Sequence, residues 1–82
     1  MISFKTLQAV CSQTARILRE ERKRQGLSMS AVAERAGLSQ QMVSYVEREM
    51  RTPNLDTVLR MAYALDLDAA DLIRRAQKAA SV

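Results

Sequence analysis

The chain has 82 residues, no histidine and one cysteine, and its formal net charge at pH 7 is +4. This length fits one domain spanning 1–82, while the lack of histidine and the single thiol argue against a metal site, a cofactor and catalysis. No apolar run is long enough for a membrane span and no signal-peptide pattern is present, so we expect a cytoplasmic protein.

The positive charge is unevenly placed along the chain. Residues 1–25 hold six basic and two acidic residues, whereas residues 26–82 hold seven of each. The excess therefore lies between Arg16 and Arg24. Cations in this position either suit the C-terminal end of a helix dipole or form part of a phosphate-facing surface.

Residues 3–25 contain no helix breaker and carry apolar residues at helical spacing. The stripe consists of Phe4, Leu7, Val10 or Cys11, Ala15 and Leu18, and Arg22 continues it. This pattern predicts either one long helix ending at Gly26, or a short leader helix with a restart near Ser12. We expect an N-terminal helical extension over about 1–14.

Two short helices are predicted next, over about 29–36 and 40–48. Ser28 and Ser39 precede them, and each hydroxyl can accept a hydrogen bond from an N–H in the first turn. Gly37 ends the first helix, because the turn needs a positive φ that glycine adopts without strain. The apolar positions are Val32, Ala33 and Ala36 in the first helix and Val43, Val46 and Met50 in the second.

Two further helices are expected after Pro53. Asn54 is a good cap for a helix over 55–65, and Asp68 for one over about 69–80. The expected core stripe of the first is Leu55, Val58, Leu59, Ala62 and Leu65. The apolar positions of the second are Leu72, Ile73, Ala76 and Ala80.

The spacing of a small residue, a glycine and two branched apolar residues (Ala33, Gly37, Val43 and Val46) resembles the helix-turn-helix of the lambda-repressor and Cro-like (XRE-type) DNA-binding family. LREERKRQGLS (18–28) looks like that family's first helix, and RTPNLDTVLRMAYAL (51–65) like the entry to its fourth. The resemblance covers about residues 15–73. It implies an all-α, compact bundle of about five helices.

The resemblance also implies which residues contact DNA. Gln40 and Gln41 resemble the base-reading positions, with Ser44 and Tyr45 one turn further on, and glutamine matches the N6/N7 pair of adenine. Phosphate contacts are expected from the start of the second helix and from basic or polar side chains nearby. These candidates are Ser28, Met29, Ser30, Arg19, Arg48, Arg51 and Asn54.

Arg22 and Glu47 match family positions that form an ion pair between the first and third helices. Three positions depart from the family pattern. Met29 stands where glutamine usually braces the first reading residue, so we expect Gln40 to be held differently. Glu49 and Asp66 stand where glycine is usual, so either each has a strained positive φ or the chain turns differently.

Family members bind two half-sites as two-fold dimers. The resemblance therefore implies a bacterial or phage transcription regulator that binds palindromic double-stranded DNA as a homodimer. The expected dimer surface uses Phe4, Leu7, Leu72, Ile73 and Ala76, although Leu72 and Ile73 could instead complete the monomer core. Two alternatives remain: an antitoxin that also binds a toxin protein, and a restriction–modification controller protein.

Overall fold

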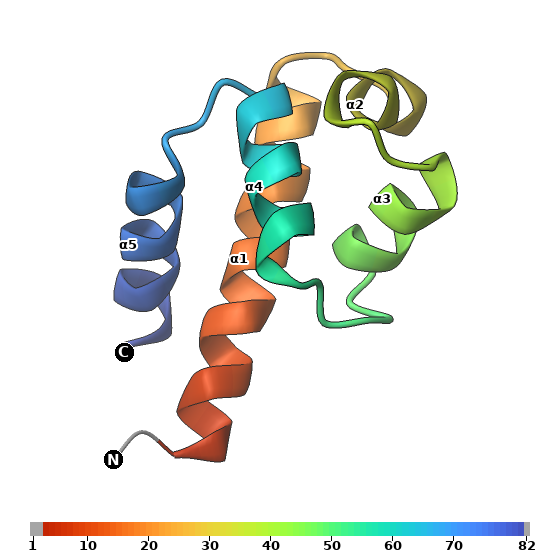
Figure 1. Ribbon diagram of the computed structural model, residues 1–82. Coiled ribbons are helices and arrows are strands. Elements are labelled where there is room, and N and C mark those ends of the chain that lie inside the picture. Colours follow the sequence, from red (N-terminus) through yellow and green to blue (C-terminus); the bar gives the residue numbers. More distant parts are fainter. Residues whose placement is uncertain (1–2, 82) are drawn as a thin grey trace.

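The computed structural model describes residues 3–81 and contains five helices in that range (Figure 1). They are α1 (Phe4–Arg24), α2 (Met29–Ala36), α3 (Gln40–Glu47), α4 (Leu55–Ala64) and α5 (Ala69–Ala80). The expectation of an all-α bundle of about five helices is confirmed. Residues 1–2 of the expected extension, and residue 82, lie outside the described residues.

Each of the four shorter helices begins at a side chain that accepts a hydrogen bond from a backbone N–H of the first turn, as the sequence predicts. The donor–acceptor distances are 2.8 to 3.0 Å. The caps are Ser28, Ser39, Asn54 and Asp68. Local side-chain chemistry therefore fixes where the chain enters each helix.

α1 is one continuous helix of 21 residues, so a restart near Ser12 is wrong. Its C-terminal half is part of the core, where Ala15, Ile17 and Leu18 are buried. Its N-terminal half projects past α4 in Figure 1, and there Phe4 and Leu7 remain 72% and 49% exposed. Only part of this helix is thus integrated into the bundle.

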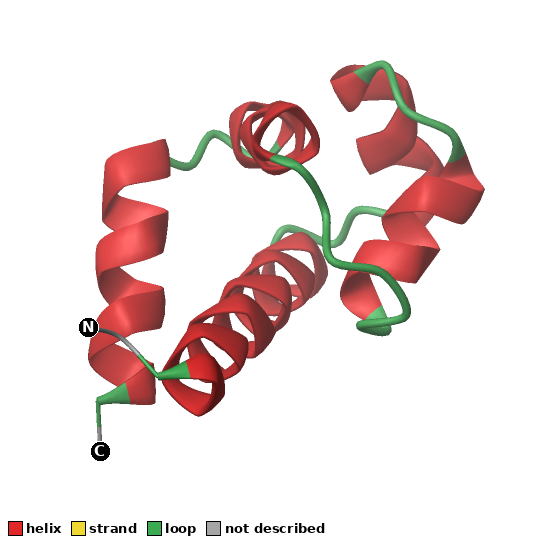
Figure 2. Cartoon of the chain, turned by 60° about the horizontal axis from the view of Figure 1, so that its bottom comes forward, coloured by secondary structure: helices red, strands yellow, loops and turns green. Residues whose placement is uncertain are grey.

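The helices form two groups around a shared aliphatic core. α1 packs along α5, while α2 packs against α3 and α4. Figure 2 shows α5 on one side of α1 and α4, and α2 and α3 on the other. The largest fully buried side chains come from every helix or its cap: Leu18, Val32, Val43, Val46, Met61, Leu65 and Leu72.

Two apolar residues assigned to the core are in fact exposed. Met50 is 57% exposed because α3 ends at Glu47 and the chain turns away before reaching it. Leu55 is 70% exposed, whereas Met61, which the expected stripe omitted, is fully buried. At about 100° per residue, Leu55 lies roughly a quarter-turn from the centre of the buried face of α4, and Met61 lies near it.

The expected dimer surface also needs correction. Leu72 and Ala76 are fully buried, because α1 covers the apolar face of α5, so neither is available to a second subunit. Ile73 is 36% exposed and remains available. Of the two residues proposed as alternatives for the monomer core, Leu72 is therefore the one that completes it.

Candidate functional site

The turn between α2 and α3 depends on Gly37. This residue has φ 69° and ψ 34°, a left-handed conformation that glycine adopts at little cost. The N–H of Leu38 donates to the carbonyl of Ala33 at 2.9 Å, which closes the end of α2. Ala33, Val43 and Val46 are buried and fill the angle between the two helices, in the places the sequence predicts.

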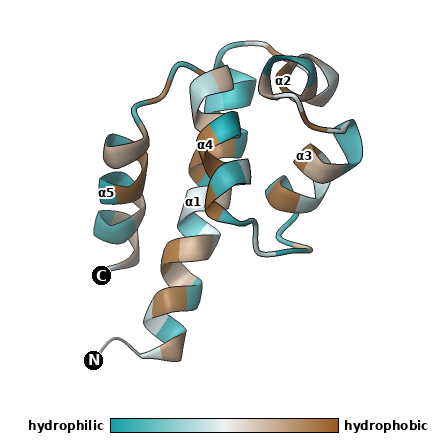
Figure 3. Cartoon of the chain, viewed as in Figure 1, coloured by the Kyte–Doolittle hydropathy of each residue, from teal (hydrophilic) through white to brown (hydrophobic). Residues whose placement is uncertain are grey.

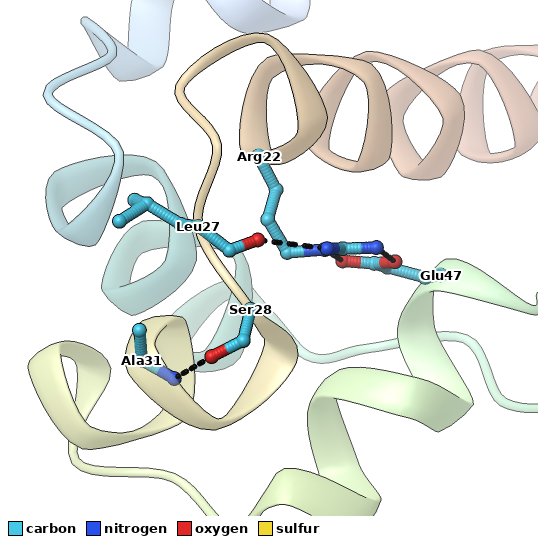
Figure 4. A network of polar contacts seen from close by, with 5 residues as sticks. All are labelled: Arg22, Leu27, Ser28, Ala31 and Glu47. Atoms are coloured by element: carbon cyan, nitrogen blue, oxygen red, sulfur yellow. Dashed lines mark hydrogen bonds and ion pairs between the residues drawn. The ribbon is translucent and has the colours of Figure 1, made fainter.

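Arg22 and Glu47 form a buried two-point ion pair (Figure 4). Arg22 Nε lies 2.6 Å from Glu47 Oε2, and Nη2 lies 2.9 Å from Oε1. Arg22 Nη1 also donates to the carbonyl of Leu27 at 2.9 Å. One guanidinium therefore joins α1, the α1–α2 connection and the C-terminal end of α3, and its hydrogen bonds with Glu47 raise the pKa of Arg22.

The outward face of α3 is polar. Gln40 and Gln41 are exposed, whereas Ser44 and Tyr45 are half-buried. Gln40 is braced from α2: the hydroxyl of Ser30 lies 3.3 Å from its Oε1. The half-buried side chain of Met29 packs against the core instead. Ser30 thus supplies the contact that Met29 cannot make.

Tyr45 has partners on two sides. The amide Nε2 of Gln41 donates to its hydroxyl at 2.5 Å, and the guanidinium carbon of Arg51 lies 5.0 Å from the centre of its ring. Arg51, which the sequence suggested as a phosphate ligand, is therefore already in contact with a suggested base-reading residue. No local sequence pattern predicted this contact, because Tyr45 lies on α3 and Arg51 lies in the connection that follows it.

The remaining phosphate candidates lie on exposed surface but in separate elements. Ser28 and Ser30 are at the start of α2, Arg48 caps the end of α3, and Arg19 lies on α1. The Oδ1 atom of Asn54 accepts from Thr57 N, so this side chain serves as a helix cap. Among residues 3–81, no group of His, Cys, Asp or Glu side chains could hold a metal ion.

Sequence reasoning missed two polar side chains that hold the helices together. Arg60 Nη1 of α4 donates to the carbonyl of Ala36 at 3.2 Å, which ties α4 to the end of α2. Gln25 Nε2 donates to the carbonyl of Leu65 at 2.7 Å and ties the end of α1 to the end of α4. Both bonds join segments distant in sequence, so no local pattern points to them.

Glu49 and Asp66 both have a positive φ, with values of 58° and 56°. Of the two alternatives that the sequence left open, the chain therefore adopts the strained positive φ rather than a different turn. In each turn the N–H of the following residue donates to a carbonyl in the last turn of the preceding helix. Met50 N donates to Tyr45 O at 2.9 Å, and Leu67 N donates to Ala62 O at 2.8 Å. The positive φ of these non-glycine residues costs about 1 kcal/mol for each residue.

An apolar hollow of about 460 Å³ lies between the projecting half of α1 and the α3–α4 connection. A smaller hollow of about 140 Å³ shares part of this wall and reaches Ile73 on α5. Figure 3 shows hydrophobic residues along the projecting part of α1. The apolar lining of the larger hollow includes Phe4, Leu7, Cys11, Ala15, Val46 and Pro53. Within residues 3–81, no helix is both long and apolar enough to cross a membrane.

Comparison with known proteins identifies relatives of this chain. A family model described as helix-turn-helix matches residues 18–72. Two curated proteins of Mycobacterium tuberculosis, named as the uncharacterized HTH-type transcriptional regulators MT0491 (strain CDC 1551 / Oshkosh) and Rv0474 (strain H37Rv), are each 39% identical over 59 residues. The matched part is 72% of this chain but 42% of each relative, so the chain spans less than half of their length.

Two solved structures are similar to the chain. One is the restriction-modification controller protein C.AhdI from Aeromonas hydrophila, with a TM-score of 0.70 and 35% identity, over 76% of this chain and 94% of that one. The other is a point mutant of the restriction-modification controller protein C.Esp1396I, with a TM-score of 0.78 over 93% of this chain and 92% of that one. Its identity is 17%, so this second likeness concerns the fold.

Proposed function

Since the helix-turn-helix model matches most of its length, the chain belongs to that family, and we propose that it is a cytoplasmic transcription regulator that binds double-stranded DNA. One observation carries the proposal: α3 presents an exposed polar face while the buried Arg22–Glu47 pair fixes the end of the same helix to α1. A helix of this kind fits the major groove, where side chains at its N-terminal end reach the base edges.

Base readout is assigned to the first two turns of α3. The amides of Gln40 and Gln41 can donate and accept at once, which matches the N6/N7 edge of adenine. Phosphate contacts are assigned to the start of α2 and to the basic residues around α3, because helix N-termini and arginines bind phosphate oxygens. The proposed phosphate residues are Ser28, Met29 through its backbone, Ser30, Arg19, Arg48 and Asn54.

The regulator is proposed to bind as a two-fold homodimer on a palindromic site, with half-sites about 34 Å apart. The exposed apolar residues Phe4, Leu7 and Ile73 border the two hollows and are the natural dimer surface. An 82-residue chain buries only about 60% of its unfolded surface, so a second subunit also adds stability.

Selection of bound DNA from a random pool tests the function and the symmetry together. We expect a palindromic sequence, with affinity that falls steeply as salt rises. A pool that shows no enrichment at moderate salt would contradict sequence-specific binding.

Two alanine substitutions, one at Gln41 on α3 and one at Gln77 on α5, test the role of α3. Gln41→Ala should weaken binding to the selected site about tenfold or more, and binding to unrelated DNA far less. Gln77→Ala is the matched control, since Gln77 is an exposed glutamine on α5. Equal losses on both DNAs for the Gln41 variant would remove this residue from readout.

A restriction–modification controller is the second candidate function. The likeness to C.AhdI favours it, because 94% of that chain is covered at 35% identity. Genes for a DNA methyltransferase and a nuclease should then flank the gene for this chain, and the selected site should lie upstream of them. A gene placed among unrelated neighbours would leave the general regulator as the function.

A further inference from the structure

We propose that Gln41, Tyr45 and Arg51 form one preorganised reading unit, in which Arg51 positions Tyr45 rather than binding phosphate; this rests on the proposed DNA binding. The unit spans two elements, since Gln41 and Tyr45 lie one turn apart on α3 and Arg51 lies in the α3–α4 connection. Its contacts are the 2.5 Å hydrogen bond from Gln41 to Tyr45 and the 5.0 Å stack of Arg51 on the ring.

The two contacts fix Tyr45 from different sides. A guanidinium within about 6 Å of a ring centre is attracted to the negative face of the ring, so Arg51 holds the ring plane. The Tyr45 hydroxyl accepts from Gln41, which leaves its own O–H free to donate. Because the ring is also half-buried, its hydroxyl is a fixed point at the edge of the exposed face.

This fixed point orients the amide of Gln41. A glutamine amide has two N–H donors and one carbonyl acceptor, and the Tyr45 hydroxyl uses one donor. The remaining N–H and the carbonyl oxygen are the donor–acceptor pair that adenine N7 and N6 require. An amide already held in this orientation loses less freedom on binding than a free one. The unit therefore gives Gln41 its preference for adenine.

The same geometry separates two roles for Arg51. A phosphate ligand strengthens binding to every sequence, and its removal flattens the salt dependence by about 0.9 in the log–log slope. A positioning residue acts through Tyr45 and Gln41, so its removal lowers the preference for adenine and leaves the salt dependence unchanged. Arg48, exposed at the end of α3, has the first role in the proposed function and serves as the reference.

The experiment measures binding of Tyr45→Phe, Arg51→Met and Arg48→Met to the selected site and to the same site with one adenine replaced. That adenine is the one whose preference Gln41→Ala abolishes. Tyr45→Phe and Arg51→Met should each reduce the preference for it about tenfold, with the salt slope unchanged. The double variant should lose little beyond either single variant, because both act on one unit.

Three results would contradict, respectively, the bracing of Gln41, the positioning role of Arg51 and the proposed DNA binding. An unchanged adenine preference in Tyr45→Phe overturns the bracing of Gln41. A flatter salt slope in Arg51→Met, with the preference intact as in Arg48→Met, makes Arg51 a phosphate ligand. Failure of the unmodified protein to bind any DNA at low salt refutes the proposed function instead.

The contacts themselves are tested in the free protein. The side-chain amide NMR signals of Gln41 should move in both Tyr45→Phe and Arg51→Met, but not in Arg48→Met. Unmoved signals in both variants would refute the unit without reference to DNA.

Discussion

The two halves of α1 have the same backbone structure and very different surroundings. Residues 15–24 supply Leu18, which is fully buried, and Arg22, which holds Glu47 of α3. Residues 4–14 supply Phe4 and Leu7, which are largely exposed beside the larger hollow. A helix can thus be continuous without being equally anchored along its length.

Only one of these two halves fixes the orientation of α3. The side-chain hydrogen bonds from α1 to Glu47 come from Arg22 in the buried half, so this half supports α3. The projecting half contributes apolar surface that the monomer leaves uncovered. Substitutions in the two halves should therefore affect different properties, namely stability in one and self-association in the other.

Breaking the ion pair of the buried half should have the largest effect. Glu47→Ala leaves the guanidinium of Arg22, only 11% exposed, without its carboxylate, and we expect a loss of about 3–5 kcal/mol in the free energy of unfolding. Urea denaturation measures it. Asp71→Ala breaks an exposed pair with Arg74 and should cost less than about 0.5 kcal/mol. Similar losses in both variants would show that burial of the first pair does not matter.

Truncating one leucine in each half compares them directly. Leu18→Ala removes a fully buried side chain and should cost about 3 kcal/mol. Leu7→Ala removes one that is 49% exposed and should cost under about 1 kcal/mol in dilute protein. Thermal unfolding together with sedimentation at rising concentration measures both properties. A Leu7 variant that associates as strongly as the unmodified chain would remove the projecting half from the dimer surface.

The smallest effect concerns pH. Hydrogen bonds from Arg24 and then Gln25 lower the pKa of Glu21 from 4.5 to about 2. Because the folded-state value is the lower one, the stability from this carboxylate is present above pH 4.5 and is lost as pH falls towards 2. Arg24 is exposed, so solvent screening keeps the contribution well below that of the Glu47 pair.

Glu21→Gln provides the measurement. Its deficit in unfolding free energy relative to the unmodified chain should be constant near neutral pH and shrink between pH 4.5 and 2. A deficit independent of pH over this range would mean that the carboxylate is not stabilised by folding.

Features fixed by local chemistry could be predicted from the sequence. The capping side chains of Ser28 and Ser39 and the positive φ of Gly37 depend on a few neighbouring residues, and all three were predicted. Their spacing with Ala33 and Val43 was enough to indicate the helix-turn-helix. The existence and order of the helices followed from these signals.

Features set by tertiary neighbours could not be predicted. Periodicity gave α5 an apolar face but not the helix that covers it, so Ala76 was assigned to the dimer surface and Leu72 was left between dimer and core, although α1 buries both. Periodicity also placed Leu55 on the core stripe of α4, because it does not give the centre of the buried face, and Leu55 is exposed. Within the site, the bond from Ser30 to Gln40 and the stack of Arg51 on Tyr45 depend on how two segments meet in space.

The brevity of α3 has a consequence for protein engineering. A helix of eight residues is marginal in water by itself, so residues 40–47 need the bundle around them to exist as a helix. Transplanting these residues into another scaffold would carry Gln41 and Tyr45 but leave Arg22, Ser30 and Arg51 behind. The unit to transplant is therefore the whole bundle, because the core that supports α3 also includes Leu18, Met61 and Leu72.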